Sequence, residues 1–157
     1  MFDPSGNEVT FQGAVDPNTP ISQGWLRASH RKLDPDRSRP DRPYHPHDEI
    51  QPLTPGEVYE LQVEIWPTCI VVPASYRLAV SVRGSDYRYE GELSPFARSF
   101  HYANRGVGPY THTDPEHRPA NVFAQPVTLH VGGRYPSHVL LPVIPAADGP
   151  EVAIAQG

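Results

Sequence analysis

The stretch Val58–Trp66, VYELQVEIW, carries the clearest secondary-structure pattern of the chain. Its alternate positions hold the apolar side chains of Tyr59, Leu61, Val63 and Ile65. Strict alternation of apolar and polar residues is typical of a β-strand that buries one face. A Pro-Gly pair precedes the stretch and a proline follows it, and both are strand-ending signals. The stretch therefore predicts a half-buried strand.

On both sides of this stretch, the same alternation recurs in shorter segments. Tyr76–Arg83 alternates strictly, and Glu8–Gln12 does so near the N-terminus. Further strands are expected at Pro126–Val131 and Ser137–Ile144, where apolar residues lie close to turn-forming residues. We therefore expect an all-β domain of about five to seven short strands, arranged as an antiparallel sandwich or jelly roll.

Proline is the most unusual feature of the composition. The chain has 20 prolines in 157 residues, about 13% against an average near 5%. Because proline breaks helices and ends strands, this content favours short strands joined by rigid turns. No apolar helical period is long enough to predict an independent helix.

Charge and cysteine content exclude several classes of function. The net charge of −5 gives no overall attraction for nucleic acid or for an anionic membrane. No apolar run of about 18 residues is present, so no membrane span is expected, and the N-terminus lacks a signal-peptide pattern. Cys69 is the only cysteine, which excludes an intrachain disulfide and fits a reducing compartment. We expect a cytoplasmic protein that binds neither nucleic acid nor membrane.

The segment Gly24–Asp48, GWLRASHRKLDPDRSRPDRPYHPHD, is too polar and too rich in proline to be a core strand. Trp25–Leu33 predicts one or two helical turns, and Pro35–Pro55 predicts an extended path across a surface. Arginines beside aromatic residues suit nucleic acid or a protein interface. Because four aspartates interleave with the basic residues, the local field largely cancels and a protein interface is favoured.

The chain shows no motif for a catalytic serine. A nucleophile elbow needs Gly-x-Ser-x-Gly on a strand-to-helix turn, and Gly84-Ser85-Asp86 lacks the second glycine. Ser29 and His30 are adjacent in sequence, which is a poor geometry for a serine–histidine hydrogen bond. We therefore expect no catalytic residue in this chain.

The histidines leave a metal site open as an alternative. His45, His47 and Asp48 lie close together, and His30 or His117 could supply a further ligand through the fold. Packing of these histidines against Tyr44 and a partner surface is the favoured interpretation. We expect no metal and no cofactor.

Several motifs together resemble a known hydrolase family. They are GWLRASHR at Gly24–Arg31, the YHPH loop at Tyr44–His47, the Pro-Gly-Glu turn, the strand ending at Trp66–Thr68, and SHVLLPV at Ser137–Val143. In this order they resemble the C-terminal domain of the cocaine-esterase and Xaa-Pro dipeptidyl-peptidase hydrolases. The resemblance extends over nearly the whole chain.

The resemblance implies a jelly-roll, galactose-binding-like β-sandwich that packs on an α/β-hydrolase catalytic domain, in the same parent chain or in a separate one. In that family the catalytic triad lies in the α/β-hydrolase part. Residues 1–145 would form the sandwich, truncated at its N-terminus and lacking its first strands, and residues 146–157 a flexible tail. A sandwich without its early strands leaves an unpaired edge, so aggregation or homo-oligomers are expected.

Two functions follow, with different residues. In the first, the chain is the non-catalytic sandwich of a serine hydrolase and is inactive alone. Its docking residues would be Trp25, Arg27, His30, Arg31, Tyr44 and His45. In the alternative, the chain is an independent galactose-binding-like module that binds ligands through loop tyrosines. Those tyrosines would be Tyr87, Tyr89, Tyr102 and Tyr110.

Overall fold

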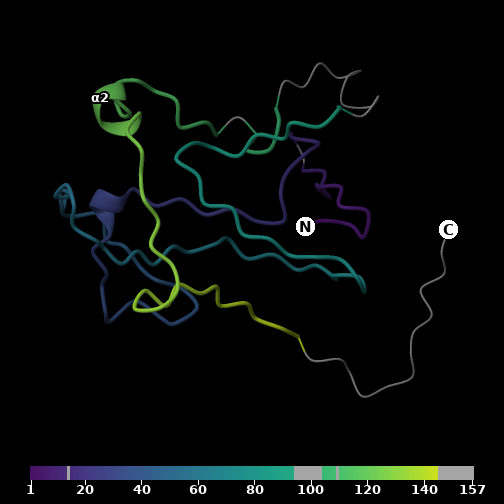
Figure 1. The fold of residues 1–157 in the computed structure, drawn as a ribbon, viewed down its shortest axis with the longest axis horizontal. Helices are drawn as coiled ribbons and strands as arrows, with labels where there is room; N and C mark the ends of the chain where they lie inside the picture. Colours follow the sequence, from purple (N-terminus) through teal and green to yellow (C-terminus); the bar gives the residue numbers. More distant parts are fainter. Residues whose placement is uncertain (14, 94–103, 109, 145–157) are drawn as a thin grey trace.

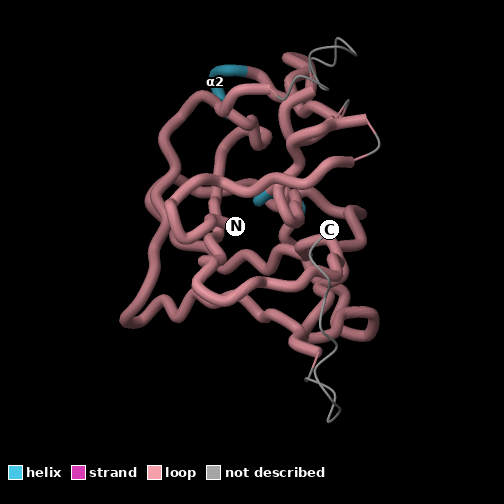
Figure 2. The backbone as a smooth tube through the Cα atoms, turned by 90° about the vertical axis from the view of Figure 1, so that its right-hand side faces the viewer, coloured by secondary structure: helices cyan, strands magenta, loops and turns pink. Residues whose placement is uncertain are grey.

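Short turns and isolated bridges dominate the backbone of the computed structural model, which describes residues 1–13, 15–93, 104–108 and 110–144. Within them the helices are the 3-10 turn η1, Ala28–His30, and the single α-helical turn α2, Ala120–Phe123. Figure 2 shows the other described backbone as loop. Tyr102 and the predicted tail at 146–157 lie outside the described residues.

Backbone pairing between distant segments is limited, in the described part of the chain, to single antiparallel bridges. Phe2 and Arg77 exchange two backbone hydrogen bonds of 2.9 and 3.0 Å, which ties the N-terminus to the segment predicted as a strand at 76–83. The full set of bridges is Phe2–Glu8, Phe2–Arg77, Phe11–Thr19, Arg39–Arg42 and Gly132–Tyr135. Since these bridges do not extend into a ladder, the predicted β-sandwich remains a prediction.

The turns expected from glycine and proline are confirmed. At the first, the Gly6 N–H donates to the Asp3 carbonyl at 3.0 Å, with Gly6 at a φ of +90° that favours glycine. At the second, Tyr76 N–H donates to the Pro73 carbonyl at 3.2 Å, and the trace in Figure 1 doubles back there. The Gly-Gly turn closes with a 2.8 Å bond from Tyr135 N–H to the Gly132 carbonyl.

The prediction of an extended path over Pro35–Pro55 is wrong for its first part, because that part closes on itself. Asp34 N–H donates to the Tyr44 carbonyl at 3.0 Å, and Arg39 and Arg42 exchange two hydrogen bonds. The Asp34 carboxylate accepts the N–H groups of the two residues that follow Pro35, at 3.0 and 3.2 Å. An aspartate that bonds its own following backbone stabilises a turn, which accounts for the difference.

The Val58–Trp66 stretch contacts the Gly24–Asp48 region and its flank. Trp66 N–H donates to the Gln23 carbonyl at 2.9 Å, and His45 Nε2 lies 2.9 Å from the Gln62 carbonyl. Leu61, Val63 and Ile65 nevertheless stay 42%, 42% and 45% exposed. The face predicted to be buried is therefore left largely uncovered by the described residues.

Among the described residues, the least exposed buried polar side chain is that of Asp16, which is 2% exposed. Its Oδ2 accepts the backbone N–H groups of Gly106 and Gly108 at 2.6 and 2.8 Å. Its Oδ1 accepts the N–H of Asn18 at 2.9 Å. The carboxylate therefore joins two loops that are far apart in the sequence.

Candidate functional site

Two tryptophans form an aromatic cluster at the start of the Gly24–Asp48 segment. The rings of Trp25 and Trp66 meet edge to face, with centroids 5.1 Å apart, and the His112 ring lies 5.7 Å from Trp25. Trp25 is 38% exposed and Trp66 is 60% exposed. These are the only two tryptophans of the chain, and that rarity was the sequence signal that could have identified Trp66. The cluster therefore exposes a large aromatic surface.

Asp86 fixes the geometry of this cluster by accepting three hydrogen bonds. Its Oδ1 accepts from Trp25 Nε1 at 3.2 Å and from His112 Nδ1 at 2.8 Å, while its Oδ2 accepts from the His112 backbone N–H at 2.6 Å. Burial by itself raises the pKa of this carboxyl group. The hydrogen bonds from His112 and Trp25 outweigh burial, so the net pKa of Asp86 lies below its ordinary value.

We expect the Asp86→Asn substitution to lower the free energy of unfolding at pH 7 by about 1–3 kcal/mol, because an amide cannot accept from all three donors. A lowered folded-state pKa stabilises the fold above the unfolded value, near 3.9, and this contribution is lost as the pH falls through the folded pKa. The difference between wild type and variant should therefore shrink below about pH 4. Urea denaturation at pH 7, 5 and 3 measures it.

Asp36→Asn is the matched control, since the Asp36 side chain is exposed and makes no hydrogen bond to the described residues. It should change stability little at any of these pH values. A difference between wild type and Asp86→Asn that stays constant from pH 7 to pH 3 would contradict the role assigned to the Asp86 carboxylate.

Arg27 links the cluster region to α2. Its guanidinium lies 5.1 Å from the ring centroid of Phe123, and its Nη2 donates to the His117 carbonyl at 2.9 Å. The Arg118 guanidinium also lies over Phe123, at 4.9 Å. One aromatic ring of α2 therefore meets two cations, a contact worth about 0.5–1 kcal/mol each at an exposed site. Neither α2 nor Phe123 was anticipated from the sequence, because the helix is a single turn.

Three of the predicted docking residues, Arg31, Tyr44 and His45, are half-buried against this chain itself. Arg31 donates to the Gln51 carbonyl at 2.6 Å and lies over the Tyr59 ring at 4.3 Å. The Arg37 guanidinium lies over the Tyr44 ring, 3.6 Å from its centroid. Both ring nitrogens of His45 lie 2.9 Å from backbone carbonyls, of Lys32 and Gln62. Trp25 and Arg27, in contrast, are exposed. All five residues lie in one short segment, so the sequence alone did not show which of them are exposed.

The three-residue metal site at His45, His47 and Asp48 does not form. The ring nitrogens of His45 are bonded as described above, and Asp48 pairs with Lys32 Nζ at 3.1 Å. Across the described ranges, no group of three His, Cys, Asp or Glu side chains is placed to hold a metal ion. His30 instead meets His47, with their Nδ1 atoms 3.3 Å apart.

The candidate ligand-binding tyrosines that the structure describes differ in exposure and in their contacts. The Tyr87 hydroxyl donates to Glu8 Oε1 at 2.8 Å. Burial is the main cause, and this hydrogen bond the second, of a pKa of Tyr87 far above its ordinary value. Tyr89 is half-buried beside Arg105. Tyr110 is 73% exposed. Sugar binding through these residues therefore remains a prediction.

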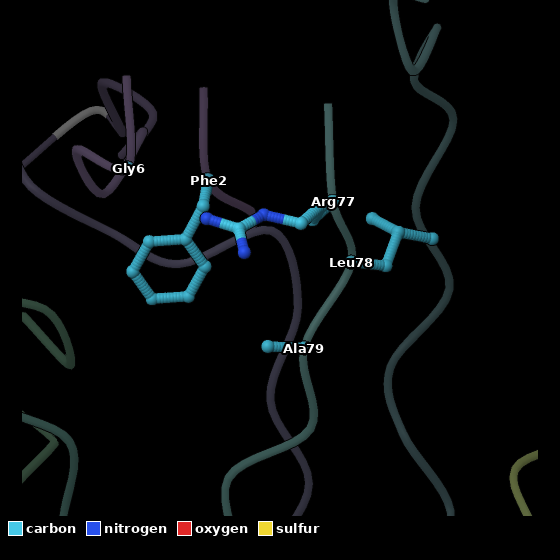
Figure 3. A pocket seen from close by; sticks show the side chains of 5 residues that line it. All are labelled: Phe2, Gly6, Arg77, Leu78 and Ala79. Carbon is cyan, nitrogen blue, oxygen red and sulfur yellow. The ribbon is translucent and has the colours of Figure 1, made fainter. Parts of the chain in front are cut away.

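A shallow pocket of about 380 Å³ lies beside the N-terminal bridge. Figure 3 shows the Arg77 side chain reaching toward the Phe2 ring, with Leu78 and Ala79 on the following positions. Only one lining side chain, that of Arg77, is charged, and none of the candidate tyrosines lines the pocket. Its lining shows no pair of groups suited to acid–base or nucleophilic chemistry.

The Asp86–His112 pair has the geometry of the acid–histidine half of a catalytic triad. A triad also needs a serine hydroxyl on the histidine. Within the described residues, no serine hydroxyl donates to a histidine ring, and Ser29 instead accepts a 2.8 Å hydrogen bond from Gln51 N–H through its backbone carbonyl. The pair therefore orients an imidazole beside the tryptophans without completing a triad.

Residues 1–140 match the family described as the X-Pro dipeptidyl-peptidase C-terminal non-catalytic domain. The chain belongs to this family, and the resemblance inferred from its GWLRASHR segment is confirmed. No curated protein and no solved structure matches the chain significantly. None of the helices in the described residues is long and apolar enough to cross a membrane.

Proposed function

We propose that the chain is a β-sandwich accessory domain that docks on an α/β-hydrolase catalytic domain and does no chemistry of its own. Its family is described as non-catalytic and as part of X-Pro dipeptidyl-peptidases, which supports a catalytic partner. The observation that carries the proposal is the exposed Trp25–Trp66 pair. Tryptophan and arginine are the residue types most enriched among the energetically dominant contacts of protein interfaces.

The docking surface would centre on Trp25, Trp66 and Arg27. Arg31, Tyr44 and His45 would support it from beneath by holding the Gly24–Asp48 segment against its own chain. Ile65 and Leu61 of the same stretch as Trp66 are also more than 40% exposed. Exposed apolar surface that is large enough marks an interaction site, and it favours self-association when the partner is absent. The lone exposed Cys69 suits the reducing, cytoplasmic setting proposed for the complex.

The purified chain should hydrolyse neither Xaa-Pro amides nor short acyl esters. It should form a complex with the α/β-hydrolase domain of an X-Pro dipeptidyl-peptidase from the same organism, measured by calorimetry and size-exclusion chromatography. Removing a central tryptophan from an interface costs about 2 kcal/mol or more, which is roughly 30-fold in affinity. Trp66→Ala should weaken the complex by at least that factor.

Val71→Ser is the control, since Val71 is 81% exposed and lies outside the tryptophan cluster. It should leave the affinity unchanged. Turnover by the isolated chain would contradict the accessory role. Equal affinities for wild type and Trp66→Ala would contradict the proposed surface while leaving the accessory role in place.

A further inference from the structure

The closest approach of two histidine rings in the described residues is that of His30 and His47. Their Nδ1 atoms face each other at 3.3 Å, and the ring centroids are 5.3 Å apart. Two nitrogen ligands at about 2.1 Å from one tetrahedral ion are about 3.4 Å apart. The spacing of the two Nδ1 atoms is therefore that of a chelating pair.

The backbone around the pair is held from both sides. Gln51 N–H donates to the Ser29 carbonyl at 2.8 Å, and Arg31 Nη1 donates to the Gln51 carbonyl at 2.6 Å. His45 adds its 2.9 Å contact to the Lys32 carbonyl. These three ties fix residues 29–32 against residues 45–51. A preorganised support of this kind reduces the cost of bringing two ligands to one ion.

His47 itself adopts an unusual conformation. Its φ is +57°, in the left-handed region that non-glycine residues rarely occupy. Strained backbone persists where the surrounding structure imposes it, often at ligand sites. In this conformation the His47 ring reaches His30, and in the described part of the chain neither Nε2 atom has a hydrogen-bond partner.

We propose that His30 and His47 form a bidentate site for a divalent transition-metal ion, bound through the two Nδ1 atoms. In the metal-free pair one ring donates its Nδ1 proton to the other. On binding, that ring becomes the Nε2–H tautomer, so both Nδ1 lone pairs face the ion and no net proton is released. Water or a partner side chain completes the coordination, and affinity follows the order Zn²⁺ < Cu²⁺ and Ni²⁺ < Cu²⁺. The site is independent of the proposed docking function.

The test uses the full chain, stripped of metal with a chelator and titrated with Cu²⁺ and Zn²⁺. We expect one ion per chain, with two imidazole nitrogens coupled to Cu²⁺ in the electron paramagnetic resonance spectrum. His47→Asn keeps a residue that tolerates positive φ but removes the ring, and His30→Gln removes the other ligand. Each variant should lose one nitrogen coupling and bind Zn²⁺ at least tenfold more weakly.

His138→Gln is the matched control, because His138 is exposed and lies outside the pair. It should bind like wild type. The proposal is overturned if wild type binds no ion, if it shows a single nitrogen coupling, or if His30→Gln and His47→Asn bind like the control. Two independent ligand variants keep the test decisive should one of them fail to fold.

Discussion

Asp16→Ala should lower the free energy of unfolding by about 3–5 kcal/mol, the larger of the two strongest effects we expect. The substitution leaves the N–H groups of Asn18, Gly106 and Gly108 without their acceptor, and all three residues are buried. An unpaired buried donor costs about 1–3 kcal/mol, and the bonds lost here are made to a charged group. Urea denaturation followed by tryptophan fluorescence measures the loss.

Two further variants distinguish the effect of losing the Asp16 carboxylate from a general effect of replacing an aspartate in this chain. Asp16→Asn keeps one acceptor oxygen and should lose roughly half as much stability, because an amide oxygen replaces only part of the set. Asp41→Ala removes a side chain that is 65% exposed and whose ion pair with Arg39 is long, at 4.0 Å. This substitution should leave the free energy of unfolding almost unchanged. If Asp16→Ala proves as stable as Asp41→Ala, the hydrogen bonds of Asp16 contribute nothing to the free energy of unfolding.

Gly24→Ala is expected to destabilise the chain by about 3 kcal/mol, at the upper end of what overpacking costs. A Cβ at this position would overlap the carbonyl oxygen of Glu64 and lie 2.9 Å from its carbonyl carbon and 3.1 Å from Ile65 Cα. All three neighbours are backbone atoms, so no side-chain rotation relieves the overlap. The Gly24 segment would have to move away from Trp66.

The same substitution should also disrupt the tryptophan cluster, since Trp25 follows Gly24 directly. A red shift of the tryptophan emission would report greater exposure of the rings to water. Gly84→Ala is the control, because an added Cβ there meets no atom within 4 Å. Gly24→Ala with the stability and emission of Gly84→Ala would mean that the close approach to Glu64 is not needed.

Local features of the fold were predictable from the sequence because their causes are local. The turns at Asp3–Gly6, Pro73–Ser75 and Gly132–Gly133 follow from residues that set their own φ and ψ. The closed loop at Asp34–Tyr44 differs from the predicted extended path because the Asp34 carboxylate accepts hydrogen bonds from its own following backbone. Membership of the family could also be predicted from the sequence, since it depends on motifs that follow one another in a fixed order along the chain.

The candidate site was only partly predictable, because its contacts join distant segments. Trp25 and Arg27 could be selected by residue type, but their neighbours Trp66, Asp86 and Phe123 come from elsewhere in the chain. Asp16 looked like an ordinary loop residue beside a proline. Alternation in Val58–Trp66 predicts a face but does not specify what covers it, and this is why the sandwich is still a prediction.

The joint at Asp16 also bears on when the chain can fold during synthesis. Its bonds to Gly106 and Gly108 span 90 and 92 residues, and Arg27 reaches His117 across 90. At about 5–20 residues per second, a ribosome needs roughly 5–18 s to make that intervening length. Contacts this distant also close slowly, because the loop entropy is lost before they form. Ordering of the N-terminal loop around Asp16 is therefore a late event in the folding of the chain.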